Sequence, residues 1–119
     1  MNYSAYSVVV GEAFEGTGDF LRPNSIDAIG YLLDSGVKVA LVYGDRDFAC
    51  NWIGGEKVST AVDYSMSEEF KAAGYMHILS TIGVGGQVRQ YGNFSFSRVY
   101  QAGHEGKRVL LMYLNYADI

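Results

Sequence analysis

The chain has 119 residues, of which 49% are hydrophobic and 18% charged, with a formal net charge of −4 and a pI near 5.0. This length suits one small domain, and the acidic balance argues against a basic patch, so no nucleic acid is expected as a partner. No run of about 18 apolar residues predicts a membrane span, and no signal peptide is recognisable at the start of this chain.

The first third of the chain predicts a short strand, a loop and a helix. Residues 6–10 are rich in valine and could form a strand, and the glycines of residues 11–19 indicate a loop. Ser25 is a candidate N-cap for a helix that ends at Ser35-Gly36. The apolar residues of this helix recur at helical spacing and are Ile26, Ile29, Leu32 and Leu33.

A continuous apolar run follows at residues 37–43. It does not alternate with polar residues, as expected of a parallel strand that is buried on both faces. Residues 25–43 therefore predict a helix, a turn and a parallel strand, which make one step of an α/β sheet. The predicted fold class is α/β, with parallel strands and flanking helices.

The rest of the chain predicts further helices and a group of strands. A helix at 52–62 is weakened by Gly54-Gly55, and a better one spans 67–73 with Ser67 as its cap. The remaining expected elements are strands at 75–82, 87–91 and 93–100, a turn at 83–86 and a closing helix at 108–116.

Two acids and a histidine follow predicted strands. Asp45 and Asp47 come after the apolar run and Gly44, and His104 stands in a loop after the last predicted strand. Open α/β sheets carry functional groups at the carboxyl ends of their strands, and an acid followed by a histidine is the order of the last two triad members in α/β-hydrolases. The pattern alone leaves open which acid would pair with His104, because turn acids commonly bond their own backbone. His77 has no motif around it and is expected to be structural or exposed.

Four segments resemble, in order, the serine carboxypeptidase family, and most of all its fungal members. They lie at 43–56, which contains Gly44-Asp45-Arg46-Asp47-Phe48-Ala49-Cys50-Asn51-Trp52, and at 70–75, 91–96 and 98–105. The resemblance implies that residues 1–119 are the C-terminal part of a single α/β-hydrolase domain, which they leave incomplete. It also implies proteolysis that releases C-terminal amino acids from peptides, no cofactor, and a secreted or vacuolar location.

The resemblance also implies roles for single residues. It assigns Asp47 as the acid and His104 as the base of a Ser-Asp-His triad. Cys50 and Asn51 match residues that line the leaving-residue side of the site, where the C-terminus of the peptide substrate would bind. Glu105 is expected either to border this substrate pocket or to be a solvated loop acid.

The nucleophile of such a triad is missing from this sequence. No Gly-x-Ser-x-Gly motif occurs in the 119 residues. The Val-Pro motif that usually follows the histidine in the family is also missing, and the chain continues instead as Glu105-Gly106-Lys107-Arg108-Val109-Leu110-Leu111. The chain is therefore expected to be inactive alone and to need the N-terminal part of the same enzyme as a partner. The alternative is a non-catalytic remnant that binds peptide or pairs with another chain.

Other sites receive brief predictions. Asn2 begins a glycosylation pattern and could be modified, whereas Asn93 begins one inside a predicted strand, where no glycan is expected. No metal site is predicted, because the two histidines lie far apart in the sequence and Cys50 is the only cysteine. Trp52 is expected to belong to the core.

Overall fold

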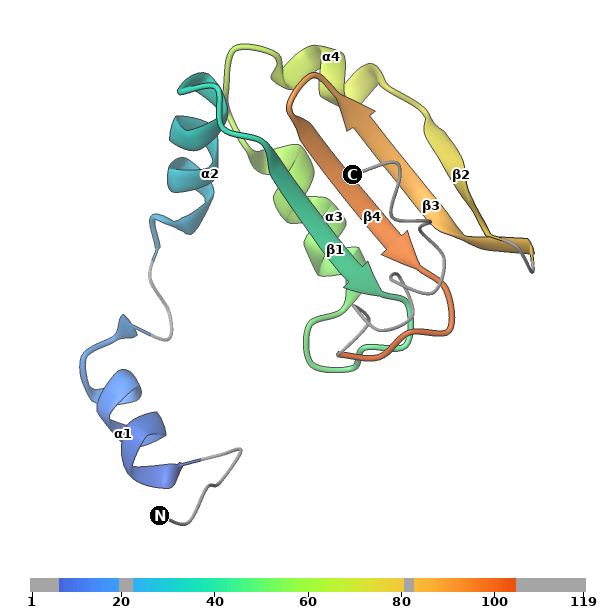
Figure 1. Ribbon diagram of the computed structural model, residues 1–119. Coiled ribbons are helices and arrows are strands. Elements are labelled where there is room, and N and C mark those ends of the chain that lie inside the picture. The colour runs from blue at the N-terminus through green and yellow to red at the C-terminus, as the bar shows by residue number, and fades with distance from the viewer. Residues whose placement is uncertain (1–6, 20–22, 81–82, 105–119) are drawn as a thin grey trace.

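The computed structural model describes residues 7–19, 23–80 and 83–104, and these have an α/β architecture (Figure 1). The strands are β1 Val39–Gly44, β2 Tyr75–Ser80, β3 Gly83–Tyr91 and β4 Phe94–Val99. The helices are α1 Val8–Gly16, α2 Ser25–Asp34, α3 Trp52–Ala61 and α4 Ser67–Ala72. The strands form one sheet in the order β1-β4-β3-β2, and α3 packs behind β1 and β4. The closing helix predicted at 108–116 lies outside the described residues.

The sheet is mixed rather than parallel throughout. β1 runs parallel to β4, with Val39 opposite Phe94 and Gly44 opposite Val99. β3 runs antiparallel to both of its neighbours, β4 and β2. The predicted parallel step is therefore found in one strand pair only. This pair matters for function, because it places the carboxyl ends of β1 and β4 side by side.

The core lies between the sheet and the helices. Phe94 and Phe96 are fully buried on the helix side of β4. The ring of Phe70 stacks on Phe94 at 4.4 Å between centroids, and Tyr64 meets Phe94 edge-on at 5.8 Å. Leu33 and Val62 complete the buried cluster. This aromatic cluster ties α2, α4 and the segment after α3 to the centre of the sheet.

The strand predicted at residues 37–43 exists as β1, but the prediction that it is buried on both faces is wrong. Half-buried and exposed residues alternate along it. Val39, Leu41 and Tyr43 pack against the core, whereas Val42 is 40% exposed. The reason is that the helices next to the sheet cover only one of its faces within the described part of the chain (Figure 1).

Helix α1, Val8–Gly16, occupies most of the stretch for which a strand at 6–10 and a loop at 11–19 were predicted, so that prediction is wrong. Ser7 is its N-cap: the Oγ atom accepts the N–H of Val10 at 3.5 Å, and the carbonyl accepts the N–H of Gly11 at 3.0 Å. β-branched residues lower helix propensity only slightly, so the cap and the helix-forming Glu12 and Ala13 outweigh the valines. No residue of α1 is buried.

The other helices match their predictions, with shifted caps. α2 begins at Ser25, but Asn24 rather than Ser25 holds the N-cap position. α4 begins at Ser67, and Met66 precedes it in the cap position. Gly36 follows α2 with φ at 80°, the left-handed conformation expected of a glycine after a helix.

β3 begins at Gly83, where a turn was predicted over residues 83–86. Gly86 is paired on both sides, with Ile78 of β2 and Val99 of β4. A side chain at this position would collide with the carbonyl oxygen of Arg98. The glycines here thus serve close strand packing rather than chain reversal. The strands predicted at 75–82 and 93–100 are confirmed as β2 and β4.

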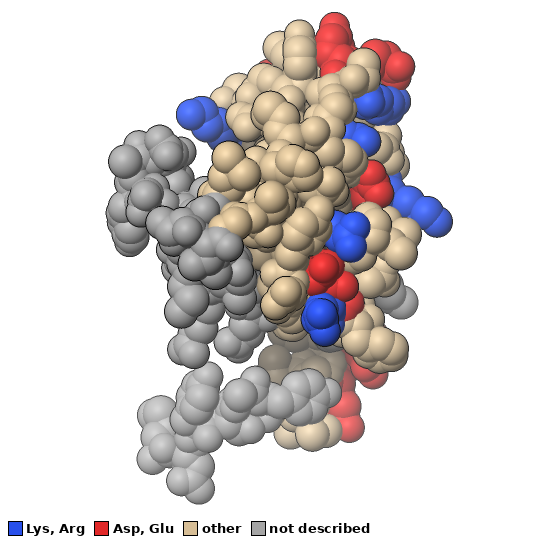
Figure 2. All heavy atoms as spheres, turned by 90° about the vertical axis from the view of Figure 1, so that its right-hand side faces the viewer, with Lys and Arg blue, Asp and Glu red and all other residues tan. Residues whose placement is uncertain are grey.

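The surface carries charges of both signs. Seen from the β2 side, acidic and basic side chains are interspersed among uncharged ones (Figure 2). Among the described residues, no helix has the length and apolar character needed to cross a membrane.

Truncating the aromatic core should destabilise the fold. We expect Phe94→Ala to lower the free energy of unfolding by about 3–5 kcal/mol, because it removes a fully buried ring and leaves a cavity. Phe48→Ala, at a side chain that is 99% exposed, should change it by less than about 0.5 kcal/mol. Urea denaturation followed by circular dichroism measures both, and equal effects would contradict the assigned core.

Candidate active site

The loops that leave β1 and β4 are held directly against each other. The N–H of Asp45 donates to the Val99 carbonyl at 2.9 Å, and the N–H of Arg46 donates to the Ala102 carbonyl at 2.9 Å. A Cβ atom at Gly44 would overlap the carbonyl oxygens of Ala102 and Gly103. Only glycine lets the two backbones approach this closely.

Asp47 and His104 meet where these loops touch. The Oδ2 atom of Asp47 lies 2.8 Å from Nδ1 of His104. The Oδ1 atom accepts the N–H groups of Ala49 and Cys50, each at 2.9 Å. The carboxylate is nearly enclosed, with 7% of the Asp47 side chain exposed, whereas the His104 side chain is 69% exposed. A shielded carboxylate with fixed hydrogen bonds therefore holds the exposed imidazole ring of His104 in place.

The pairing determines where the protons sit. The N–H of Cys50 lowers the pKa of Asp47 below its ordinary value, and the hydrogen bonds from His104 and Ala49 act in the same direction against the opposing effect of burial. An ionised carboxylate can only accept hydrogen bonds, so His104 donates through Nδ1. In the neutral ring this leaves Nε2 as a proton acceptor. The arrangement can therefore act as a general base whose tautomer is set by the acid.

Asp45 has a different partner from the one expected. Its Oδ1 atom accepts the N–H of Gln101 at 2.7 Å, across the two loops, rather than a backbone N–H of its own turn, as is common for turn acids. Its Oδ2 atom lies 3.8 Å from Nη2 of Arg98. The guanidinium group of Arg98 covers the ring of Trp52 at 3.8 Å. The structure thus brings Asp47, and not Asp45, to His104.

The predicted substrate-binding residues lie in different settings. Cys50 is exposed, and Asn51 is the N-cap of α3, where its Oδ1 atom accepts the N–H of Gly54 at 2.9 Å. Ligand atoms of Asp47, Cys50 and His104 all lie within 4.8 Å of one another. This grouping could hold a metal ion, although the sequence predicted no metal site. Glu105 and Asn2 lie outside the described residues.

Sequence reasoning missed a second polar group on the helix side of the sheet. The hydroxyl of Tyr75 donates to Oε1 of Glu56 at 2.6 Å, and Nη2 of Arg89 lies 3.7 Å from the same oxygen. Burial, followed by this hydrogen bond, raises the pKa of Tyr75 to about 12. These side chains come from α3, β2 and β3, and no motif in the sequence marks their convergence. Glu56 and Tyr75 line a cavity of about 230 Å³ together with Trp52, Gln87, Phe96 and Arg98.

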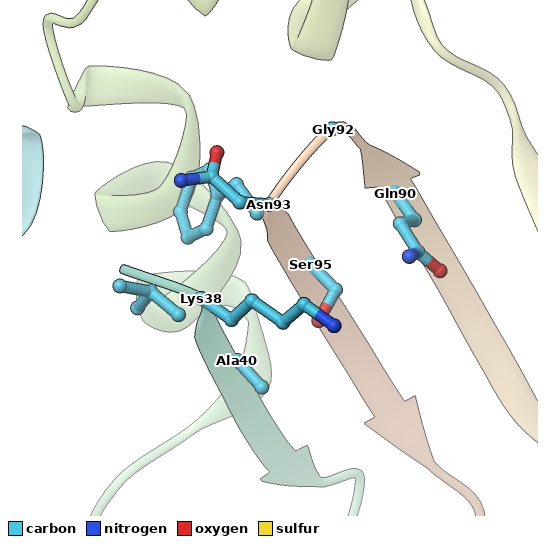
Figure 3. A pocket seen from close by; sticks show the side chains of 8 residues that line it. Lys38, Ala40, Gln90, Gly92, Asn93 and Ser95 are labelled. Atoms are coloured by element: carbon cyan, nitrogen blue, oxygen red, sulfur yellow. The ribbon is translucent and has the colours of Figure 1, made fainter. Parts of the chain in front are cut away.

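A second pocket lies at the opposite end of the strands from His104. It has a volume of about 250 Å³ and is lined by Lys38, Val39, Ala40, Gln90, Gly92, Asn93, Phe94 and Ser95. Figure 3 shows Lys38 and Ser95 beside each other on the sheet. The Nδ2 group of Asn93 donates to the carbonyls of Leu33 and Val37, each at 2.9 Å. A glycan on Asn93, which the sequence disfavoured, would disrupt these bonds.

Comparison with known proteins gives a consistent result. The family described as serine carboxypeptidase matches residues 1–109. The chain is 55% identical over 109 residues to carboxypeptidase S1 homolog A of Arthroderma benhamiae, covering 88% of this chain. It is 50% identical over 108 residues to a carboxypeptidase Y homolog of the same fungus, covering 87% of this chain.

The structural comparison points the same way. The chain resembles Kex1(delta)p, a prohormone-processing carboxypeptidase from Saccharomyces cerevisiae, with a TM-score of 0.59 and 26% sequence identity. The match covers 66% of this chain and 18% of that protein. The chain likewise spans 17% of the length of each of the two Arthroderma benhamiae relatives.

A side chain at Gly44 should push apart the loops that follow β1 and β4, and so move Asp47 away from His104. We expect Gly44→Ala to lower the free energy of unfolding by about 1–3 kcal/mol, because the new methyl group must displace backbone carbonyls. Gly74→Ala is the matched control, since a Cβ atom there meets nothing within 4 Å. Urea denaturation compares the two variants, and equal stability would contradict the close approach at Gly44.

The lowered pKa of Asp47 predicts a loss of stability in acid. The unfolded chain takes up a proton near pH 3.9, whereas the folded chain resists until a lower pH. The stabilisation is thus complete above about pH 4 and is lost as pH falls through the native pKa. Urea denaturation at pH 5, 4 and 3 should give a flatter pH dependence for Asp47→Asn than for the unchanged chain. Asp63→Asn, which removes an exposed carboxylate, should keep most of the dependence.

Proposed function

The chain belongs to the serine carboxypeptidase family, and we propose that residues 1–119 form the C-terminal segment of a serine-type carboxypeptidase with an α/β-hydrolase fold. The family match over residues 1–109 and the similarity to Kex1(delta)p support this proposal. The observation that carries it is the 2.8 Å contact between Asp47 and His104. Two residues implied by the resemblance thus meet although 57 positions separate them.

In the proposed mechanism, Asp47 and His104 are the acid and the base of the triad. Nε2 of His104 takes the proton from a serine hydroxyl as that oxygen attacks the peptide carbonyl. His104 then gives the proton to the departing amino group, and later activates water to release the acyl group. Asp47 keeps the ring in the required tautomer and stabilises the imidazolium that forms. Its low pKa supports this role, because the acid stays ionised throughout.

The proposed substrate is the C-terminus of a peptide, and the leaving group is a single amino acid. Cys50 and Asn51 follow Asp47 in the same loop and are proposed to line the leaving-residue side. The exposure of Cys50 supports this placement. Asn51 uses its Oδ1 atom as a helix cap, so its contribution would be made by the amide Nδ2 group. Glu105 is proposed to border the same pocket.

The serine is proposed to come from the part of the carboxypeptidase domain that precedes this segment in the family. The outer edge of β1 pairs with no strand among the described residues, which leaves backbone groups available for another strand. Val8, Val9 and Val10 of α1 are also more than half exposed, as expected of a surface that packs against further structure. Family membership further supports a secreted or vacuolar location.

The same exposed edge supports a second candidate function, in which the chain binds a peptide or another chain without catalysis. The two candidates differ in one respect. Catalysis requires both Asp47 and His104, whereas strand addition at β1 requires neither. A substitution of either residue therefore distinguishes the two functions.

The proposal is tested by supplying the missing serine. Residues 1–109 would replace the corresponding segment of carboxypeptidase S1 homolog A from Arthroderma benhamiae, which is 55% identical. We expect this grafted enzyme to release the last residue of an N-blocked dipeptide. His104→Ala and Asp47→Asn should each lower kcat by about 10⁴-fold or more, because the base or its correct tautomer is lost.

Three controls accompany this experiment. The 119-residue chain alone should show no turnover, and a dipeptide with an amidated C-terminus should resist the grafted enzyme. His77→Ala, at an exposed histidine on β2, should retain full activity. A grafted enzyme that is active without His104, or an active 119-residue chain that loses activity on His104→Ala, would contradict the proposal.

A further inference from the structure

We propose that Asp45 is a positioning residue, which holds the loop after β4 in the conformation that presents His104 to Asp47. Its Oδ1 atom accepts the N–H of Gln101 at 2.7 Å. Gln101 precedes His104 by three positions in the same loop. The Asp45 side chain thus acts on the histidine through the backbone of a neighbouring segment.

The conformation of Gln101 is the first observation that supports this inference. Among the described residues it is the one non-glycine residue with a positive φ, at 57°. Residues other than glycine adopt this left-handed region at a cost in free energy, and they persist there only when the surrounding contacts hold them. The carboxylate of Asp45 is such a contact, because a charged acceptor makes a stronger hydrogen bond than a neutral one.

The second observation is the support of Asp45 itself. Its backbone N–H donates to the Val99 carbonyl at 2.9 Å. Its Oδ2 atom lies 3.8 Å from Nη2 of Arg98, whose guanidinium group in turn covers the ring of Trp52 at 3.8 Å. The Asp45 side chain is only 18% exposed. The acid is therefore anchored to β4 and to the start of α3 while it holds Gln101.

The third observation concerns the residues that follow Gln101, which lead to His104. Directly after Gln101, Ala102 is buried and its carbonyl accepts the N–H of Arg46 at 2.9 Å. His104 follows with its side chain 69% exposed, and within the described part of the chain its ring is bonded by Asp47 alone. The direction in which the chain leaves Gln101 therefore decides whether Nδ1 reaches Oδ2 of Asp47.

This inference deepens the proposed function, and it rests on that function for its effect on catalysis alone. The positioning itself can be measured without turnover. The ring N–H of His104 that bonds to Asp47 should give a proton resonance downfield of an ordinary imidazole N–H. Asp47→Asn provides the assignment, because it removes the accepting carboxylate.

The test uses the full 119-residue chain and four variants. We expect Asp45→Ala to abolish the downfield resonance, since Gln101 loses the contact that holds its conformation. Asp45→Asn should keep it, because the amide oxygen can still accept the N–H of Gln101. In Asp45→Ala with Gln101→Gly the resonance should return, because glycine adopts a positive φ without strain. Gln101→Gly alone should keep it.

A resonance that survives Asp45→Ala, or that fails to return in the double variant, would overturn the inference. If Asp45→Ala alone prevents folding, the double variant with Gln101→Gly should still fold and show the resonance, and its absence there or in Asp45→Asn would overturn the inference. Rescue by glycine at position 101 in particular would not be expected if Asp45 served general stability only.

In the grafted enzyme the same variants give a kinetic test. Asp45→Ala should lower kcat by about 10²-fold with little change in KM, as expected of a misplaced base, and Gln101→Gly should restore most of it. If the grafted enzyme proves inactive while the resonance responds as expected, the proposed function fails and the positioning role stands. If His104→Ala abolishes activity while Asp45→Ala changes neither kcat nor the resonance, the positioning role fails alone.

Discussion

The parallel pairing of β1 with β4 is the constraint on which the site depends. Parallel strands end at the same edge of a sheet, so the segments that follow them emerge together. With Gly44 opposite Val99, the two loops bond to each other at once, and Asp47 meets His104. A slip of one residue in this register would turn Phe94 and Phe96 away from the helices. The core and the site are therefore specified by the same register.

Asp47 and His104 differ in how far the described part of the chain encloses them and supplies their hydrogen-bond partners. Asp47 is shielded and receives two backbone N–H groups as well as the ring of His104. The contact with Asp47 sets the tautomer of His104, and no other residue in the described part of the chain bonds its ring. In the proposed mechanism the carboxylate would need no reorganisation when the ring takes up a proton, which is the condition under which fixed polar groups contribute most to catalysis.

Much of this could be predicted from the sequence, because some features depend on local signals. The helices α2 and α4 follow from caps and apolar spacing, and the acid and histidine were identified by motifs that resemble a family. Helix α1 was missed because its three consecutive valines favour a strand when local propensity alone is used. The exposure of Val42 was missed because an apolar run shows only that a strand can be buried. Whether each face is buried depends on whether helices pack against it, which the run itself does not show.

The contact between Asp45 and Gln101 could not be predicted for a similar reason. Its partner Gln101 is 56 positions away, and no local rule connects an acid to the amide of a residue in a different loop. The register of β1 and β4 connects them, and that register was not known from the sequence. The clearest signal was Arg98, a charged residue in a largely buried strand, which calls for an anionic neighbour.

The hydrogen bonds at Oδ1 of Asp47 have a consequence for divergence within such enzymes. The two donors belong to the main chain of Ala49 and Cys50, so any residue except proline can supply them. The side chains at these two positions can therefore change without any loss of the two bonds to the acid. If the proposed function holds, substrate preference can change in this loop through its side chains, while the environment of the Asp47 carboxylate is kept by the main chain.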